Sequence, residues 1–192
     1  FDNYISGAIS QVDKINGLIN HLLDLSRIQS GSLDFDCSVF SFGALVKSIV
    51  KKMRIIIPSH KIILNGKVSG KIKGDPERIS QAFENLLSNA AKYSTNQDKI
   101  IVELTQDSKY VKVSVTDFGI GIANDHLSKI FERFYKIPGK KEDTFPGMGI
   151  GLYLSQQIAK KHGGKITVES EKDKVTKFTL KIPVYKKPVK HK

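Results

Sequence analysis

Residues 2–30 carry two neighbouring stripes of apolar side chains at helical spacing, and no other stretch nearby offers a second helix of this kind. The first stripe, with steps of three and four, comprises Ile5, Ala8, Val12, Ile15, Ile19, Leu22 and Ser26. The second stripe comprises Leu18, His21, Leu25 and Ile28. Two adjacent stripes are typical of a bundle helix that is buried on a broad face. We therefore expect this helix, which Gly31 ends, to dock on another chain or on a helix that precedes Phe1.

The remainder of the chain mixes short strands and helices without strict alternation between the two. We expect strands at 36–40, 61–64, 71–72, 99–105, 110–116, 165–169 and 175–182. We expect helices after Ser41, from Asp75 to about Lys92, at 150–161, and a short one at 125–131. Such an order predicts an α+β sandwich rather than a doubly wound parallel sheet.

The helix after Asp75 has the clearest start signal in the chain. Asp75 is an acidic cap, Pro76 takes the first helical position, and Glu77 puts a second acid in the first turn. One arc of this helix is apolar and should face the core, through Ile79, Phe83, Leu86, Leu87 and Ala90. A neighbouring arc of roughly 100° is polar and comprises Asn85, Asn89, Lys92 and Tyr93.

That polar arc can line a binding cleft. An Asn carbonyl oxygen is a hard ligand that suits Mg²⁺, and lysine neutralises phosphate charge. Tyr93 can lie against a planar base. The alternative is an ordinary polar face in contact with solvent, and this segment alone does not decide between the two.

Two further segments could contribute to a site. Asp117 lies at a strand end, where its carboxylate can accept hydrogen bonds from an amine such as that of adenine, and Gly119 and Gly121 permit close backbone approach. Glycine pairs also occur in ordinary turns. Residues 131–136 are rich in aromatic side chains, and a cluster of this kind is more often part of the core than of a site.

Gly147, Gly149 and Gly151 open the helix at 150–161. Free backbone N–H groups at a glycine-rich helix start form an anion site. The segment is neither a dinucleotide-binding fingerprint, because the preceding stretch and the spacing differ, nor a P-loop, because it lacks the Gly-Lys-Ser/Thr ending.

Charge and cysteine content exclude several classes of protein. The net charge is +12, but the basic residues are nearly all scattered lysines with only four arginines, so sequence-specific nucleic-acid recognition is not expected. No apolar run is long enough to span a bilayer, and the first residues show no signal-peptide pattern. The single cysteine, Cys37, favours a reducing compartment, so we expect a cytoplasmic protein or the cytoplasmic part of a membrane-bound one.

Taken in order, the motifs resemble those of sensor histidine kinases, whose catalytic domain belongs to the GHKL ATP-binding superfamily. Residues 85–93 resemble the N box, 117–121 the first glycine box, 131–135 the F box and 147–152 the second glycine box. Residues 74–78 look like the approach to the N box, and 22–31 look like the end of the second helix of a dimerisation and phosphoacceptor domain. The resemblance implies a two-layer sandwich in which a mixed sheet packs on about three helices, with ATP bound under a mobile lid at roughly 123–148.

The resemblance also implies residue roles. Asn89 would bind Mg²⁺ with Asn85 nearby, and Lys92 would meet phosphate. Tyr93 would pack on adenine, Asp117 would bind its amine, and Arg133 and Lys136 would contact the γ-phosphate or the phosphoacceptor helix. The glycines and their flanking apolar residues would complete the ATP site, through Gly119, Gly121, Ile122, Gly147, Gly149, Gly151 and Leu152.

The resemblance divides the chain into a bundle helix at 1–31, a linker at 32–35, a catalytic domain at 36–184 and a basic tail at 185–192. None of the five histidines has the context of a phosphoacceptor box, and His21 lies on the wrong helix. We therefore expect a fragment that binds Mg-ATP without phosphorylating itself at the usual site. Its expected partners are a phosphoacceptor histidine domain of the same or a sister subunit, a response-regulator receiver domain and, in the full-length parent, a second copy in a homodimer.

Three alternatives stay open. A gyrase-like or chaperone-like ATPase would have a glutamate base where Asn85 stands. An anti-sigma-factor Ser/Thr kinase would lack the helix that ends at 22–31. A non-catalytic nucleotide-binding module would keep the binding residues without turnover.

Overall fold

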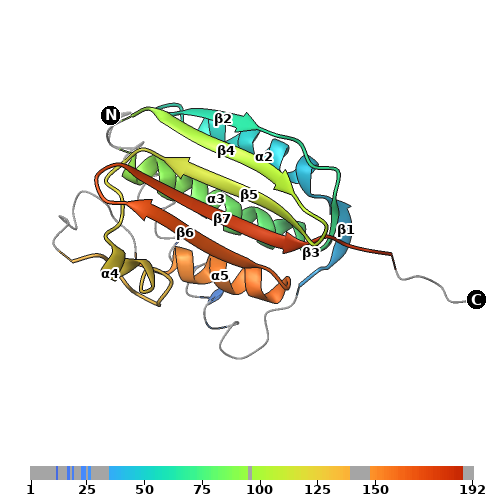
Figure 1. Cartoon of the computed structure of the whole chain (residues 1–192). Helices are drawn as coiled ribbons and strands as arrows, with labels where there is room; N and C mark the ends of the chain where they lie inside the picture. The colour runs from blue at the N-terminus through green and yellow to red at the C-terminus, as the bar shows by residue number, and fades with distance from the viewer. Residues whose placement is uncertain are drawn as a thin grey trace, which may run out of the picture.

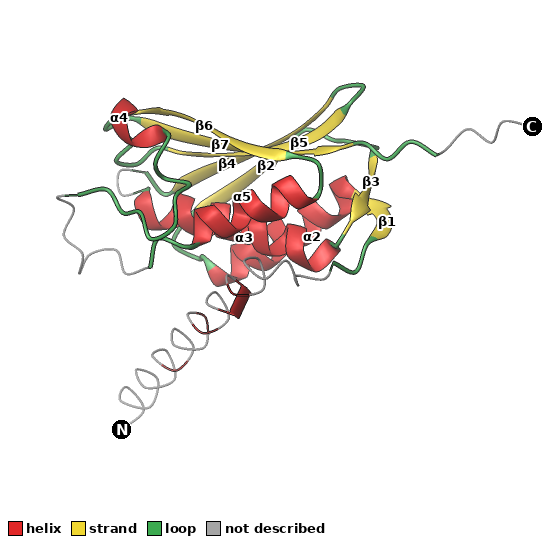
Figure 2. Cartoon of the chain, turned by 90° about the horizontal axis from the view of Figure 1, so that it is seen from below, coloured by secondary structure: helices red, strands yellow, loops and turns green. Residues whose placement is uncertain are grey.

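The computed structural model describes residues 12, 17, 19, 23, 24, 26, 35–94, 97–138 and 148–187. The six described residues before Phe35 are helical, as predicted, and the other residues of the predicted bundle helix lie outside the described part. From Phe35 onward the chain forms two layers, a sheet and a layer of helices that covers one of its faces (Figures 1 and 2). The predicted α+β sandwich is confirmed.

The main sheet has five strands in the order β2-β4-β5-β7-β6. Its strands are β2 (Lys61–Asn65), β4 (Lys99–Gln106), β5 (Tyr110–Asp117), β6 (Lys165–Glu171) and β7 (Val175–Pro183). The sheet is mixed, because β2 runs parallel to β4 while every other neighbouring pair is antiparallel. Two short strands, β1 (Ser38–Ser41) and β3 (Lys71–Gly74), pair with each other as a separate small sheet.

Three helices form the second layer: α2 (Phe42–Ile56), α3 (Pro76–Tyr93) and α5 (Gly151–Lys161). The Ser41 hydroxyl caps α2 by accepting the N–H of Ala44, as the sequence predicts. Asp75 caps α3 by accepting the N–H groups of Glu77 and Arg78. These caps fix where both helices begin, and the start of α3 in turn sets which of its residues face the sheet.

The predicted helix at 125–131 is wrong in length, because α4 comprises only Asn124–Leu127. The chain then continues as turns, with the N–H of Glu132 donating to the Lys129 carbonyl. Phe131 packs edge-on against Phe178 of β7, and Phe134 has a φ of 61°, which no α-helix accommodates. Packing of the aromatic side chains thus overrides the local helical pattern.

The strand predicted at 36–40 is also shifted, since β1 begins at Ser38. The reason is a competing hydrogen bond, because the N–H of Asp36 donates to the capping carboxylate of Asp75. The other predicted strands are right within two residues at each end.

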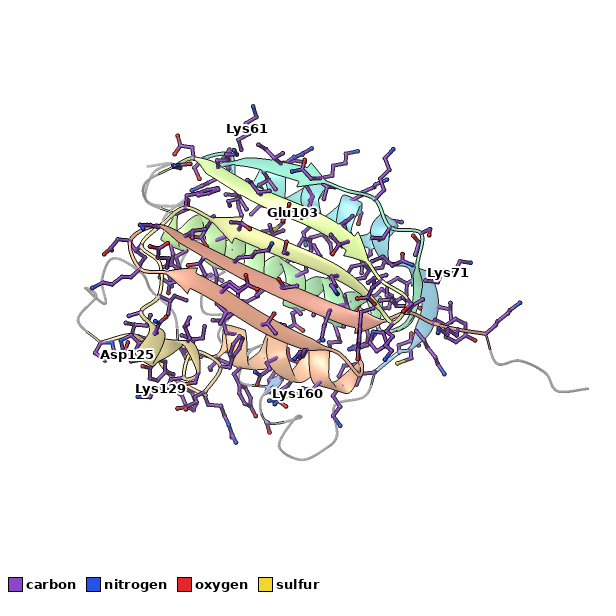
Figure 3. The ribbon with its side chains drawn as sticks, viewed as in Figure 1. Lys61, Lys71, Glu103, Asp125, Lys129 and Lys160 are labelled. Carbon is purple, nitrogen blue, oxygen red and sulfur yellow. The ribbon has the colours of Figure 1, made fainter. Side chains whose placement is uncertain are left out.

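The core lies between the sheet and the helices. Alternate residues of β4 and β5 are buried on this side, among them Val102 and Val113. The predicted apolar arc of α3 is buried in full, at Ile79, Phe83, Leu86, Leu87 and Ala90. The opposite face of the sheet carries polar groups such as the Glu103–Lys177 ion pair, and Figure 3 shows Glu103 on this face. Since α3 buries its apolar arc, its polar arc faces away from the core.

In the part of the chain that the structure describes, no helix is long and apolar enough to cross a membrane.

Candidate functional site

The polar arc of α3 lies against the start of α5. The Asn85 amide N–H donates to the Ser155 hydroxyl at 2.9 Å, and that hydroxyl donates to the Gly151 carbonyl at 2.9 Å. A Cβ on Gly151 would lie 2.4 Å from the Asn85 Oδ1 atom, so glycine leaves room for the Asn85 side chain in this position. This contact brings the first and the last of the four predicted motifs together.

The second motif, which follows β5, lies against the C-terminal end of α3. The Ile120 N–H donates to the Tyr93 carbonyl at 3.2 Å. A Cβ on Gly119 would lie only 1.8 Å from the same carbonyl oxygen, and a Cβ on Gly121, where φ is 56°, would lie 2.1 Å from the Glu171 carbonyl oxygen. Both glycines are therefore required by close backbone packing within the chain itself.

The third motif contacts the fourth. The Phe134 N–H donates to the Gly149 carbonyl at 3.1 Å, and both residues have positive φ. A Cβ on Gly149 would lie 2.7 Å from the Tyr135 carbonyl oxygen. Together with the two contacts above, this places described residues of all four motifs around the C-terminal half of α3. Gly147 and residues 139–147 of the predicted lid lie outside the described part.

Asp117 is the buried carboxylate of this region and is 3% exposed. Burial raises its pKa to about 6, although the Gly119 N–H, at 3.1 Å from Oδ1, and the charge of His60 oppose the shift. Thr176 lies directly opposite on β7 and is also buried. A buried carboxylate that still ionises near neutral pH is suited to accept a hydrogen bond from a ligand N–H.

Two lysines meet near the same end of α3. Burial lowers the pKa of Lys92, and the positive charge of Lys136 lowers it further. The two ammonium groups are thus close enough to repel each other, and an anion bound beside them would relieve that repulsion. Arg133, unlike these lysines, contacts α5. Its guanidinium stacks over the Tyr153 ring, 5.2 Å from the ring centroid.

The start of α5 offers backbone donors. No described side chain caps this helix, whose cap position is Ile150. Among the described residues its first N–H groups thus have no side-chain acceptor, and such groups, together with the helix dipole, attract an anion. Leu152 packs its side chain on the core, as does Ile122, whose N–H donates to the Ser170 hydroxyl at 2.9 Å.

No group of three or more His, Cys, Asp or Glu that could hold a metal ion occurs within 35–94, 97–138 or 148–187. The polar arc of α3 carries the carboxamide oxygens of Asn85 and Asn89. Mg²⁺ commonly keeps several waters and binds one or two protein oxygens together with substrate phosphates. The two asparagines therefore fit a Mg²⁺ ion that arrives with a nucleotide, and do not fit an all-protein metal site.

Several residues of the region were not singled out from the sequence. His60 lies close enough to lower the Asp117 pKa and bonds the Ser94 carbonyl at 3.2 Å. Ser155 holds Asn85, and Thr176 pairs with Asp117. Only Ser155 had a usable signal, because it lies one helical turn after Gly151 and hence on the same face of α5.

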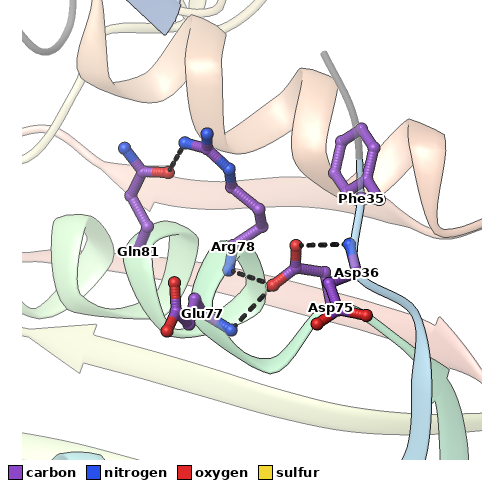
Figure 4. Close-up of a pocket in the computed structure, with 6 residues that line it drawn as sticks. All are labelled: Phe35, Asp36, Asp75, Glu77, Arg78 and Gln81. Atoms are coloured by element: carbon purple, nitrogen blue, oxygen red, sulfur yellow. Dashed lines mark hydrogen bonds between the residues drawn. The ribbon is translucent and has the colours of Figure 1, made fainter.

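An open cavity of about 590 Å³ lies elsewhere, at the N-terminal end of α3 (Figure 4). It is lined by Phe35, Asp36, Asp75, Glu77, Arg78 and Gln81. Arg78 and Asn89 are eleven positions apart on the helix, or about 17 Å along the axis. This cavity is therefore distinct from the region where the four motifs meet.

Comparison with known proteins gives matches over most of the chain. Residues 74–186 match the family described as "Histidine kinase-, DNA gyrase B-, and HSP90-like ATPase". The sensor histidine kinase RppB of Synechocystis sp. is 31% identical over 181 residues, which are 93% of this chain and 40% of that protein. The chain spans less than half the length of the first curated relatives that it matches.

Solved structures share the fold. The Acinetobacter baumannii histidine kinase AdeS superposes with a TM-score of 0.73 at 23% identity, over 93% of this chain and 82% of that one. Full-length ShkA, solved in complex with AMPPNP, superposes with a TM-score of 0.78 at 21% identity, over 97% of this chain and 40% of that one. At these identities the likeness concerns the fold.

Proposed function

The chain belongs to the family of histidine kinase-, DNA gyrase B- and HSP90-like ATPases, and on this basis we propose that residues 36–184 are the ATP-binding catalytic domain of a sensor histidine kinase. The domain would transfer the γ-phosphoryl group of Mg-ATP to a histidine, which would pass it to an aspartate of a response regulator. The sensor histidine kinase RppB matches over 93% of this chain, which supports this choice within the family.

One observation carries the proposal, namely that the four motifs lie in contact around the C-terminal half of α3. Asp117 would accept the adenine amine, and Tyr93 would pack on the base. Lys92 and Lys136 would neutralise phosphate charge, assisted by the N–H groups at Gly149 and Gly151. Phosphoryl transfer depends mainly on positioning and charge neutralisation, and these groups supply both.

Asn89, with Asn85 nearby, would hold Mg²⁺, which would neutralise charge on the phosphates when bound. The Asn85 N–H is bound to Ser155, so its carbonyl oxygen is the atom left for a metal or its waters. Arg133 would meet the phosphoacceptor helix or the γ-phosphate after leaving Tyr153. Gly119, Gly121, Ile122, Gly147 and Leu152 would shape the walls of the site.

The sequence disfavours a gyrase-like or chaperone-like ATPase, which would have a glutamate base at the position of Asn85. An asparagine held by Ser155 cannot activate a water by accepting its proton. We therefore expect slow ATP hydrolysis together with efficient transfer of the γ-phosphoryl group to a histidine.

The proposed activity is tested by mixing the chain with labelled Mg-ATP and a separate phosphoacceptor domain from a sensor kinase. We expect acid-labile, base-stable label on the added domain and none on this chain. A control reaction with the acceptor histidine replaced by glutamine should stay unlabelled. Rapid ATP hydrolysis without label on the acceptor would support the ATPase alternative instead, and nucleotide binding without either reaction would support a non-catalytic module.

Replacing Asn89 with alanine should weaken nucleotide binding mainly when Mg²⁺ is present. The reason is that the proposed role of its carbonyl oxygen is to bind the metal and not the base. We expect a loss of about tenfold in affinity for Mg-ATP and little change for ATP in EDTA, measured by calorimetry. Ser88→Ala, on an exposed position of the same helix, is the matched control. Equal losses with and without Mg²⁺ would contradict the metal role.

Acidic pH should weaken purine binding through Asp117. Its carboxylate must be ionised to accept strongly, and with a pKa of about 6 only about one tenth is ionised at pH 5. Adenosine affinity should therefore fall about tenfold from pH 7 to pH 5 and level off above pH 7. Adenosine is chosen because it has no phosphate to titrate, and purine riboside, which lacks the amine, is the control. Parallel pH profiles for both ligands would show that Asp117 does not face the amine.

We further propose that residues 1–31 belong to a dimerisation and phosphoacceptor domain, with a linker at 32–35 and a basic tail at 185–192. The partners would be a phosphoacceptor domain, a receiver domain and, in the full-length parent, a second copy. The expected compartment is the cytoplasm. Chemical cross-linking of the parent protein would test the homodimer.

A further inference from the structure

Asp24 connects the N-terminal segment, meaning the described residues 12, 17, 19, 23, 24 and 26, to the start of α3. Its Oδ1 accepts from the Arg78 guanidinium at 2.8 Å, and its Oδ2 accepts from the Gln81 amide at 2.8 Å. Arg78 also donates to the Gln81 carbonyl oxygen at 3.0 Å. Figure 4 shows the Arg78 and Gln81 side chains joined by that bond. The three groups form a closed network in which both oxygens of the carboxylate are satisfied.

This network is the means by which the described part of the segment is held. Of the six described residues before Phe35, only Asp24 is buried, whereas the apolar side chains of Val12, Ile19 and Leu23 are 49–55% exposed. Apolar packing by these three residues therefore contributes little. The contact therefore rests on charge and hydrogen bonds between largely buried groups, and removal of either charge should weaken it strongly.

The chain that follows the segment is anchored next to the network. The Asp36 N–H donates to the Asp75 carboxylate at 3.1 Å, and the Phe35 ring packs edge-on against His162 with ring centroids 5.1 Å apart. The cavity of about 590 Å³ lies between these anchors and Arg78 (Figure 4). The described residues thus show two attachments of this part of the chain to the catalytic domain, one at 35–36 and one at Asp24.

We propose that Arg78 and Gln81 form a carboxylate-docking site on α3, that its occupant is Asp24 of the same chain, and that this contact fixes the N-terminal segment relative to the catalytic domain. Arg78 and Gln81 lie on the same face of α3 as Asn85, Asn89 and Lys92, within an arc of roughly 80°. If the proposed nucleotide role of that face holds, docking sets how far the segment stands from the ATP site.

The proposal predicts a change in one distance distribution. Spin labels are attached at V12C and S48C, both exposed positions, in a C37S background. The distance between the two labels measures where the N-terminal segment lies relative to α2. We expect one narrow distribution for this parent at low salt. Asp24→Asn should broaden it and reduce the ratio of docked to undocked molecules roughly tenfold or more. Asp98→Asn, which removes an exposed carboxylate on another loop, is the control and should change nothing.

Exchanging the charges of residues 24 and 78 distinguishes loss of docking from damage to the fold. Arg78→Asp alone should broaden the distribution as Asp24→Asn does, and the double variant D24R/R78D should narrow it again, because Gln81 can present its carbonyl oxygen to the new arginine. An unchanged distribution in Asp24→Asn, or no recovery in the double variant, would overturn the proposal. A distance seen in a mixture of singly labelled chains would identify a second copy as the occupant and refute the same-chain assignment.

These measurements contain no nucleotide, so their failure is distinct from failure of the proposed function. Calorimetry with Mg-ATP should give the same affinity for Asp24→Asn as for the parent, since Asp24 contacts the opposite end of α3.

Discussion

Asp117→Asn is expected to reduce ATP affinity at least about a hundredfold while leaving the fold intact. The amide keeps the size of the side chain but loses the charge that strengthens the hydrogen bond to the adenine amine, and it can turn its own N–H₂ toward that amine. Both effects act at a position that is 3% exposed, where water cannot replace the lost acceptor. Calorimetry at pH 7.5 measures the loss.

The same substitution should leave the free protein at least as stable as before. The pKa of Asp117 is raised from its ordinary value of 3.8 to about 6, so folding favours the protonated acid. Its contribution to stability is full below pH 4 and is lost as the pH rises toward 6. At pH 7.5 the buried charge costs on the order of 3 kcal/mol, which asparagine does not incur.

Asp107→Asn is a matched control for this experiment. Asp107 lies at the other end of β5, exposed, and its pKa is held well below the ordinary range by Lys112 and by the N–H groups of Lys109 and Tyr110. Its substitution should leave ATP affinity unchanged. Retention of nearly full ATP affinity in Asp117→Asn would show that this carboxylate does not contact the base.

Gly119→Ala is expected to have the largest effect on stability. The new Cβ would lie 1.8 Å from the Tyr93 carbonyl oxygen, 2.5 Å from its carbonyl carbon and 2.8 Å from the Ser94 Cα atom. All three are backbone atoms at the end of α3, so relief requires the loop after β5 to move away from the helix. We expect a loss of more than about 3 kcal/mol in the free energy of unfolding, measured by urea denaturation.

Gly17→Ala serves as the control, because a Cβ there meets nothing within 4 Å. As an alanine in a helix it should be neutral or stabilising by up to about 1 kcal/mol. If Gly119→Ala unfolded at the urea concentration of the parent, the close approach of the Asp117 loop to Tyr93 would not exist in solution.

The sequence predicted the elements well where local signals were strong. The caps at Ser41 and Asp75 and the apolar arc of α3 placed two helices correctly, because these signals depend only on neighbouring residues. The separate pairing of β1 with β3 was not predicted, since it depends on contacts between residues thirty or more positions apart. The predicted length of α4 was wrong for a similar reason, because Phe131 packs on Phe178, which is distant in the sequence.

The candidate site was predictable as a set of motifs but not as a geometry. The order of Asn85, Asn89, Asp117 and the glycines pointed to one site, yet the reason for several glycines was different from the one expected. Gly119 and Gly151 accommodate the chain's own backbone and the Asn85 side chain, whether or not they also approach a ligand. The approach of Lys136 to Lys92 and of His60 to Asp117 is a tertiary effect that no spacing in the sequence encodes.

The central claim is that four separate stretches of the chain bind one nucleotide at the C-terminal half of α3, and amide NMR with Mg-AMPPNP tests it most directly. We predict saturable shifts, with one common dissociation constant, for backbone amides at 85–93, 117–122, 133–136 and 148–152, and no shifts for the cavity residues 35–36 and 77–81. The largest shifts at 35–36 and 77–81, or shifts in only one of the four stretches, would contradict the account.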